Sequence, residues 1–277
     1  MLHGDGNANL LDGGAGDDTL FGGLGADTLV GGSGSDTASY AASASAVTAH
    51  LDGTVGSGGD AAGDVLSGVE NLVGSAYGDT LYGDGNANML DGGAGNDTLV
   101  GGDGADTMIG GAGTDTADYG AASGGIALTL AGTGTGTGGE ANGDSLSGIE
   151  QVIGSSFDDQ FTLTLGAGWT VDGGAGTDTV HLAAASGTVT ESQLTGVLSH
   201  VEDIDFTATG TAANLSISAS FVQSLVGAGN ASSLTLNLDG NDTISVAAGQ
   251  FYDHTGNDYT FYSDNTMTTQ IAKLTTA

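Results

Sequence analysis

The sequence predicts an all-β solenoid of short strands, interrupted by two strand-containing inserts and followed by a C-terminal β-domain. Glycine occupies 54 of the 277 positions, while proline and cysteine are absent. The glycines recur with a period of nine, and short fixed periods are typical of solenoids. The formal net charge is −33, from 1 Lys or Arg against 34 Asp and Glu.

This charge excludes several classes of protein. Nothing in the chain could neutralise nucleic-acid phosphates or dock on an anionic membrane. The absence of cysteine excludes a disulfide scaffold, and no apolar stretch approaches the roughly 20 residues of a membrane span. A chain with this self-repulsion folds only with an imported cation.

The repeat unit is G-G-x-G-x-D-x-U-x, where U is apolar. Runs of it cover 4–39, 65–118 and 145–181. Inserts at 40–64 and 119–144 separate the runs, and each opens with a Tyr and an alternating stretch that predicts a strand: Val47/Ala49/Leu51 and Ile126/Leu128/Leu130. Coils at 65–73, 145–153 and 197–205 carry Glu70, Glu150 and Glu202 where other units carry Asp.

Each position of the unit has a physical role. Glycine permits a tight turn whose carbonyls converge, and the sixth residue projects a short carboxylate into that turn. The residues x-U-x then form a brief strand with one inward side chain. The predicted inward residues are Leu11, Leu20, Leu29, Leu72, Leu81, Leu90, Leu99, Met108, Val152, Phe161, Val171 and Val180, with Ala38 and Ala117 ending the full runs.

One inward side chain per nine residues buries too little surface to offset chain entropy, and stacked carboxylates repel each other. Calcium solves both problems, because it takes 6–8 carboxylate and carbonyl oxygens in flexible geometry. Magnesium requires a stricter octahedron, and transition metals are disfavoured because no Cys exists and no His lies in the turns. The alternative is that each Asp only forms an ordinary Asx turn.

The units resemble the RTX nonapeptide of hemolysin-type proteins exported by type I secretion. That resemblance implies a parallel β-roll in which each calcium lies between turns n and n+2 on one side. Carried onto this chain, it implies about seven metal-binding pairs: Asn9/Asp27, Asp18/Asp36, Glu70/Asn88, Asp79/Asp97, Asn88/Asp106, Asp97/Asp115 and Asp159/Asp178.

Some positions depart from the family pattern. Asn9 and Asn88 replace Asp, Trp169 stands where a ligand is expected, and Glu150 therefore has no evident partner. Glu70 is either a ligand or a solvated residue. Aspartates at other phases of the repeat are expected to face solvent: Asp5, Asp12, Asp17, Asp84, Asp91, Asp103 and Asp158.

The segment 182–277 is poor in glycine, and its alternating residues predict antiparallel strands: Leu234/Leu236/Leu238, Tyr259/Phe261 and Ile271. A helical turn or two is predicted within 190–204 and 219–226. The segment resembles the C-terminal parts of large RTX adhesins and surface-layer-like proteins. It is therefore a β cap over the roll predicted for 1–181, a type I secretion signal, or both.

The sequence predicts a secreted, extracellular structural protein that folds on calcium after export. Its expected partners are calcium and the type I secretion machinery, with self-association or a cell-surface ligand left open. It belongs to an adhesin, surface-layer (S-layer) or matrix protein, or it is the export module of a secreted RTX protease, lipase or epimerase. Met1 lies just ahead of an in-phase repeat, so the chain is expected to be part of something longer. The five histidines are scattered and no nucleophile–base motif exists, so we predict no enzyme.

Overall fold

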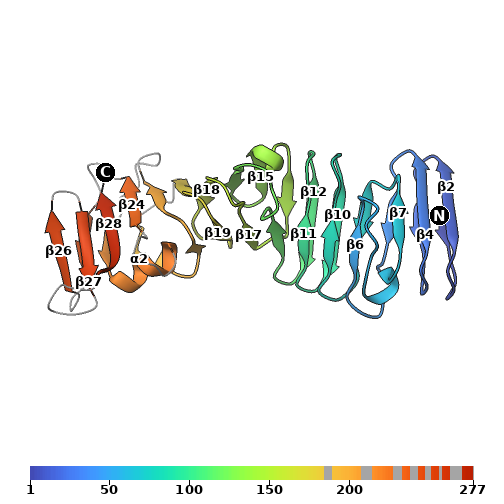
Figure 1. Ribbon diagram of the computed structural model, residues 1–277, viewed down its shortest axis with the longest axis horizontal. Coiled ribbons are helices and arrows are strands. Elements are labelled where there is room, and N and C mark those ends of the chain that lie inside the picture. Colours follow the sequence, from blue (N-terminus) through green and yellow to red (C-terminus); the bar gives the residue numbers. More distant parts are fainter. Residues whose placement is uncertain are drawn as a thin grey trace. The chain divides into compact units, whose positions relative to one another are not determined.

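The computed structural model describes residues 1–183, 189–206, 214–226, 233–237, 243–246, 251–255, 258–262 and 270–276. It forms two compact units, which are Met1–Ala122 with Thr133–Val152, and Ser123–Gly132 with Ile153–Ala277. In both units, short parallel strands follow each other in stacked coils, as Figure 1 shows. The predicted all-β parallel β-roll is confirmed.

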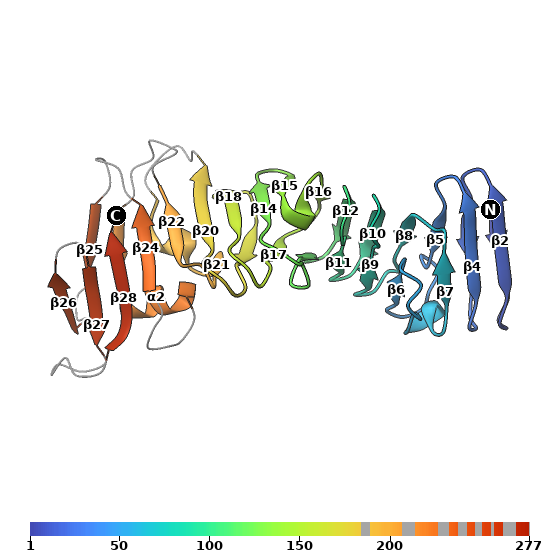
Figure 2. The same ribbon diagram turned by 45° about the horizontal axis from the view of Figure 1, so that its top comes forward.

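Unit 1 contains a parallel sheet of strands that are not consecutive in the chain (Figure 2). Its strands in spatial order are β1 (Leu2–His3), β3 (Thr19–Phe21), β5 (Thr37–Ser39), β8 (Asn71–Val73), β10 (Met89–Ala94), β12 (Thr107–Ala112) and β16 (Ser145–Ser147). Strand β15 (Gly134–Gly138) pairs antiparallel with β16.

The alternate strands of unit 1 form two further parallel sheets. One contains β2 (Leu10–Ala15), β4 (Thr28–Ser33) and β7 (Val65–Ser67), and the other contains β6 (Thr48–His50), β9 (Thr80–Tyr82), β11 (Thr98–Val100) and β13 (Thr116–Asp118). Strand β17 (Gln151–Ile153) crosses the boundary between the units. The inserts add β6 and the 3-10 helix η1 (Gly59–Ala61), and β15 and η2 (Gly139–Ala141).

The register of these strands follows from the repeat. Strands 18 residues apart pair without a shift, so that Leu72, Leu90 and Met108 form one row. Because side chains alternate across a strand, the apolar residue of each x-U-x triplet points inward. All predicted inward residues are buried, which confirms the assignment: Leu11, Leu20, Leu29, Leu72, Leu81, Leu90, Leu99, Met108, Val152, Phe161, Val171 and Val180, together with Ala38 and Ala117.

Unit 2 contains a parallel run that ends in an antiparallel hairpin. The strands in order are β14 (Ala127–Leu130), β18 (Gln160–Thr164), β20 (Thr179–Ala183), β22 (Asp203–Asp205), β24 (Ser233–Asn237), β28 (Gln270–Thr276), β27 (Asp258–Tyr262) and β26 (Phe251–Thr255). Two more parallel pairs are β19 (Thr170–Asp172) with β21 (Leu198–Ser199), and β23 (Asn214–Ile217) with β25 (Thr243–Val246).

The prediction of antiparallel strands in the tail is half right. Strand β27, with Tyr259 and Phe261, pairs antiparallel with both β26 and β28. Strand β24, with Leu234 and Leu236, instead pairs parallel with β22 and β28, because it continues the stacking of the coils. Leu238 lies outside the described residues. The predicted helical turns are confirmed as α1 (Glu191–Leu194) and α2 (Ala219–Val226).

Within the described parts of the chain, neither helix has the length and apolar character that crossing a membrane requires. The division into a roll over 1–181 and a cap over 182–277 stays a prediction.

Candidate metal centre

The glycines of each turn allow the backbones of successive turns to approach closely. In the turn at 22–27, Gly23 and Gly25 have φ of 85° and 136°, which residues with a Cβ rarely adopt. A Cβ at Gly23 would lie 2.7 Å from the carbonyl oxygen of Asp5, and one at Gly25 would lie 2.6 Å from that of Asn7. The carbonyls at positions two and four of one turn are therefore directed at the next turn on the same side.

The carboxylate at position six joins each turn to the one 18 residues earlier. The backbone N–H of Asp79 donates to Oδ1 of Asp97 at 2.7 Å, and that of Asp97 donates to Oδ1 of Asp115 at 2.8 Å. Because Oδ1 is held in this way, the other oxygen of the carboxylate has a fixed direction. The same bond joins Asn9 to Asp27 (2.7 Å), Asp18 to Asp36 (2.7 Å), Asn88 to Asp106 (2.8 Å) and Asp159 to Asp178 (2.9 Å).

The second oxygen of these carboxylates is buried and lacks a hydrogen-bond donor among the described residues. A buried charge without a partner is costly, so such atoms favour the binding of a cation. Burial, together with the charges of neighbouring carboxylates, raises the pKa of Asp97 to about 6 and that of Asp106 and Asp178 to about 7. The unpartnered Oδ2 atoms belong to Asp27, Asp36, Asp97, Asp106, Asp115 and Asp178.

The remaining oxygens that a cation needs come from the backbone. Within the described residues, no three His, Cys, Asp or Glu side chains gather as a metal site. The carbonyls at positions two and four of one turn face the next turn on the same side. The carbonyl at position one of that next turn points in the opposite direction, toward the first turn. A Cβ at Gly13, for example, would lie 2.7 Å from the carbonyl oxygen of Gly31. This mixture of carboxylate and carbonyl oxygens suits calcium.

The structure brings together six of the seven predicted pairs in this way. The exception is Glu70/Asn88. The Glu70 carboxylate instead accepts the N–H of Asp36 at 2.8 Å, and Oδ1 of Asn88 accepts the N–H of Asp84 at 2.8 Å. The Nδ2 of Asn88 donates to the Glu70 carbonyl at 3.2 Å.

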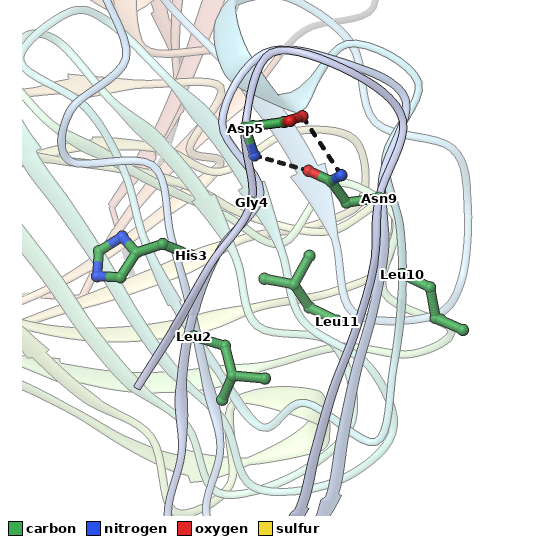
Figure 3. A pocket seen from close by; sticks show the side chains of 7 residues that line it. All are labelled: Leu2, His3, Gly4, Asp5, Asn9, Leu10 and Leu11. Carbon is green, nitrogen blue, oxygen red and sulfur yellow. Dashed lines mark hydrogen bonds between the residues drawn. The ribbon is translucent and has the colours of Figure 1, made fainter.

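Asn9 has the same local bond as Asn88 (Figure 3). Its Oδ1 accepts the N–H of Asp5 at 2.7 Å, and its Nδ2 lies 3.4 Å from Oδ1 of Asp5. An amide held inside its own turn brings no charge to the site. The pair Asn9/Asp27 therefore depends on the carboxylate of Asp27.

Two of the predicted aspartates are satisfied by a serine in their own turn. Oδ2 of Asp79 accepts the N–H of Ser75 at 2.5 Å, and Oδ1 accepts the Ser75 hydroxyl at 2.9 Å. Asp159 has the same bonds to Ser155, at 2.6 and 2.7 Å. These serines replace the second glycine of the motif in the units 74–82 and 154–162.

Glu150 has a partner that the sequence did not reveal, because its Oε2 accepts the N–H of Asp115 at 3.0 Å. Glu202 makes the same 3.0 Å bond to Asp178. Both match the bond between Glu70 and Asp36. In each of the three coils that carry a Glu, the glutamate therefore accepts the backbone N–H of the sixth-position Asp in the preceding turn on the same side. Trp169 is buried, and its Nε1 donates to the carbonyl of Ala131 at 2.5 Å.

Asp64 and Asp144 accept the same kind of bond as the sixth-position aspartates, although neither has the phase of the nonapeptide. Both are buried, and their Oδ1 atoms accept the N–H of Asp27 and of Asp106, each at 2.8 Å. The available signal was the pattern G-x-G-G-[DE]-A-x-G-D, which occurs at 56–64 and again at 136–144. Both copies lie in inserts.

The fold and its turns define a metal-binding parallel β-roll. The family model described as RTX calcium-binding nonapeptide repeat matches four copies, at residues 3–38, 64–99, 83–117 and 170–189. No curated protein matches the chain. The chain carries RTX calcium-binding repeats, which are structural and indicate a calcium-binding module of a secreted protein. Nothing in the match or the described residues shows catalytic activity.

Proposed function

We propose that this chain is an extracellular module that binds six calcium ions and folds on binding them. Each ion lies between two turns on one side of the roll. The sites are those of the pairs Asn9/Asp27, Asp18/Asp36, Asp79/Asp97, Asn88/Asp106, Asp97/Asp115 and Asp159/Asp178. Glu70/Asn88 is left out because its second member is an amide, whose oxygen accepts the N–H of Asp84 and not that of Glu70.

One observation carries this proposal. The six unpartnered Oδ2 atoms coincide one for one with the second member of these six pairs. An unpaired buried carboxylate is costly, and carboxylates on successive turns, such as Asp97 and Asp115, also repel each other. Six Ca²⁺ ions carry twelve positive charges into a chain whose formal net charge is −33. Binding therefore removes the main electrostatic cost of the fold.

The biological role follows from where calcium is available. Inside a bacterium free calcium is scarce, so the acidic chain stays unfolded and can pass a type I secretion channel. Extracellular calcium modules bind in the range of about 10⁻⁴–10⁻³ M, and binding energy to such a site is folding energy. The folded module then serves as a stiff segment of an adhesin, surface layer or matrix protein.

The decisive experiment counts the ions. Equilibrium dialysis of the full 277-residue chain should give about six bound calcium ions, and circular dichroism should show β structure appearing over the same concentrations. Magnesium at equal concentration is the control and should not support folding. A folded chain that binds one calcium ion or none would refute the proposal.

A further inference from the structure

Bonds from a backbone N–H to a carboxylate link successive turns on one side of the roll into a series. Asp64 is the last residue of the series Asn9–Asp27–Asp64, and Asp144 is the last of Asn88–Asp106–Asp144. Each accepts a backbone N–H from the previous turn, as the other aspartates do. Their own N–H groups do not continue the ladder, because they donate to the carbonyls of Ala61 and Ala141, both at 3.1 Å. Each residue is thus the last carboxylate of its series within unit 1.

These two carboxylates differ from the others at Oδ2. The Tyr40 hydroxyl donates to Oδ2 of Asp64 at 3.1 Å, and the Tyr119 hydroxyl donates to Oδ2 of Asp144 at 2.8 Å. Both tyrosines are buried, with 2% and 3% of their surface exposed. Oδ2 of Asp27 and of Asp106, one turn earlier in each series, has no donor among the described residues.

The turns before Asp64 and Asp144 also lack the carbonyl arrangement of the calcium turns. Each contains a 3-10 helix, η1 or η2, in place of G-G-x-G-x. A Cβ at Gly63 would lie 2.7 Å from the Cβ of Ala26, and one at Gly143 would lie 2.8 Å from that of Ala105. At these glycines the nearest group of the neighbouring turn is therefore an alanine methyl group, whereas at the turns of the proposed calcium sites it is a carbonyl oxygen.

We propose that the hydroxyl groups of Tyr40 and Tyr119 replace calcium at Asp64 and Asp144, so that each of these series ends in a turn closed without metal. The proposal rests on the proposed calcium sites, since it states where they stop. Burial, and next the charge of the adjacent aspartate, raise the pKa of both tyrosines far above its usual value, which keeps the hydroxyls as donors. Two independent copies with the same contacts support the assignment.

The consequence for binding is definite. Asp64 and Asp144 do not contribute to the number of calcium ions, although both are buried and joined to calcium-site residues. The tyrosines contribute to stability after all sites are filled. A hydroxyl donor, unlike calcium, is covalently part of the chain, so these turns are complete at any calcium concentration at which the backbone is folded.

The test compares Asp64→Asn, Tyr40→Phe and Asp97→Asn in the full chain, by equilibrium dialysis against calcium and by thermal melting at saturating calcium. Asparagine keeps an oxygen for the Asp27 N–H, so Asp64→Asn retains the contact between turns. We expect Asp64→Asn to bind as many ions as the wild type, and Asp97→Asn to lose one or two.

Tyr40→Phe should bind the full number of ions but melt roughly 2 °C or more below the wild type, because Oδ2 of Asp64 is left buried without a donor. Loss of one ion in Asp64→Asn, or an unchanged melting temperature in Tyr40→Phe, would overturn the proposal. A wild-type chain that binds no calcium would instead refute the proposed function, so the two failures are distinguishable.

Discussion

Replacing Asp97 by alanine should raise the calcium concentration needed for folding more than any other single carboxylate change. Asp97 is buried in the middle of the run 65–118 and joins two turns, by accepting the N–H of Asp79 and donating its own to Asp115. Asp97→Ala therefore damages the sites Asp79/Asp97 and Asp97/Asp115. It also leaves the Asp79 N–H without an acceptor, which costs about 1–3 kcal/mol.

The size of the effect follows from mass action. At a calcium concentration of about 100 Kd, one site contributes about 2.7 kcal/mol, so two sites contribute about 5 kcal/mol. Because a tenfold change in concentration is worth about 1.4 kcal/mol per ion, that loss, compensated by the four remaining ions, raises the folding midpoint about eightfold. Asp18→Ala damages one site and should raise the midpoint about twofold.

Calcium titrations followed by circular dichroism measure these midpoints. Asp103→Ala is the matched control, because Asp103 is exposed and lies at the third position of its turn. It removes the same charge six residues away and should leave the midpoint unchanged. Equal shifts for Asp97→Ala and Asp103→Ala would show that bulk charge, rather than the sixth-position geometry, controls folding.

Three further outcomes are expected. EDTA should unfold the chain and millimolar calcium should refold it cooperatively; a β spectrum that survives chelation at low ionic strength would contradict this. Without calcium, the free energy of unfolding should fall as pH rises from about 4 to 7. The reason is that the folded chain binds more protons there: the pKa is about 6 for Asp97 and about 7 for Asp106, against about 3.9 when unfolded. More β structure in EDTA at pH 8 than at pH 5 would refute that sign. The purified chain should hydrolyse no peptide, ester or glycan, and turnover that persists through further purification would disprove it.

The fold could be predicted because the structure repeats with a period of two nonapeptides, 18 residues, which is a multiple of the period of the sequence. Leu72, Leu90 and Met108 recur every 18 residues, and strands that pair without a shift place them in one row. The same translation carries Asp79 to Asp97 and then to Asp115. A constant period therefore specifies the pairing, the core and the position of the carboxylates together.

Features outside the period could not be predicted. Tyr40 meets Asp64 across an insert of different sequence, so no spacing within the nonapeptide links them. Glu70 accepts a backbone N–H as a sixth-position carboxylate does, but the donor is Asp36, before the insert 40–64, and the pair predicted from the phase was Glu70/Asn88. In the tail, the alternation of Leu234 and Leu236 specifies which face is buried but not the direction of the neighbouring strand, and β24 is parallel to its neighbours.

Two kinds of hydrogen bond with opposite polarity join successive turns on one side of the roll. In every pair the earlier turn supplies the N–H and the later turn supplies the carboxylate, as Asp79 and Asp97 do. In the opposite direction, the backbone N–H of Thr98 in the later turn donates to the carbonyl of Asp79 in the earlier turn at 2.8 Å. Each turn is therefore both donor and acceptor to its neighbour, so a joint is complete only when both turns are folded.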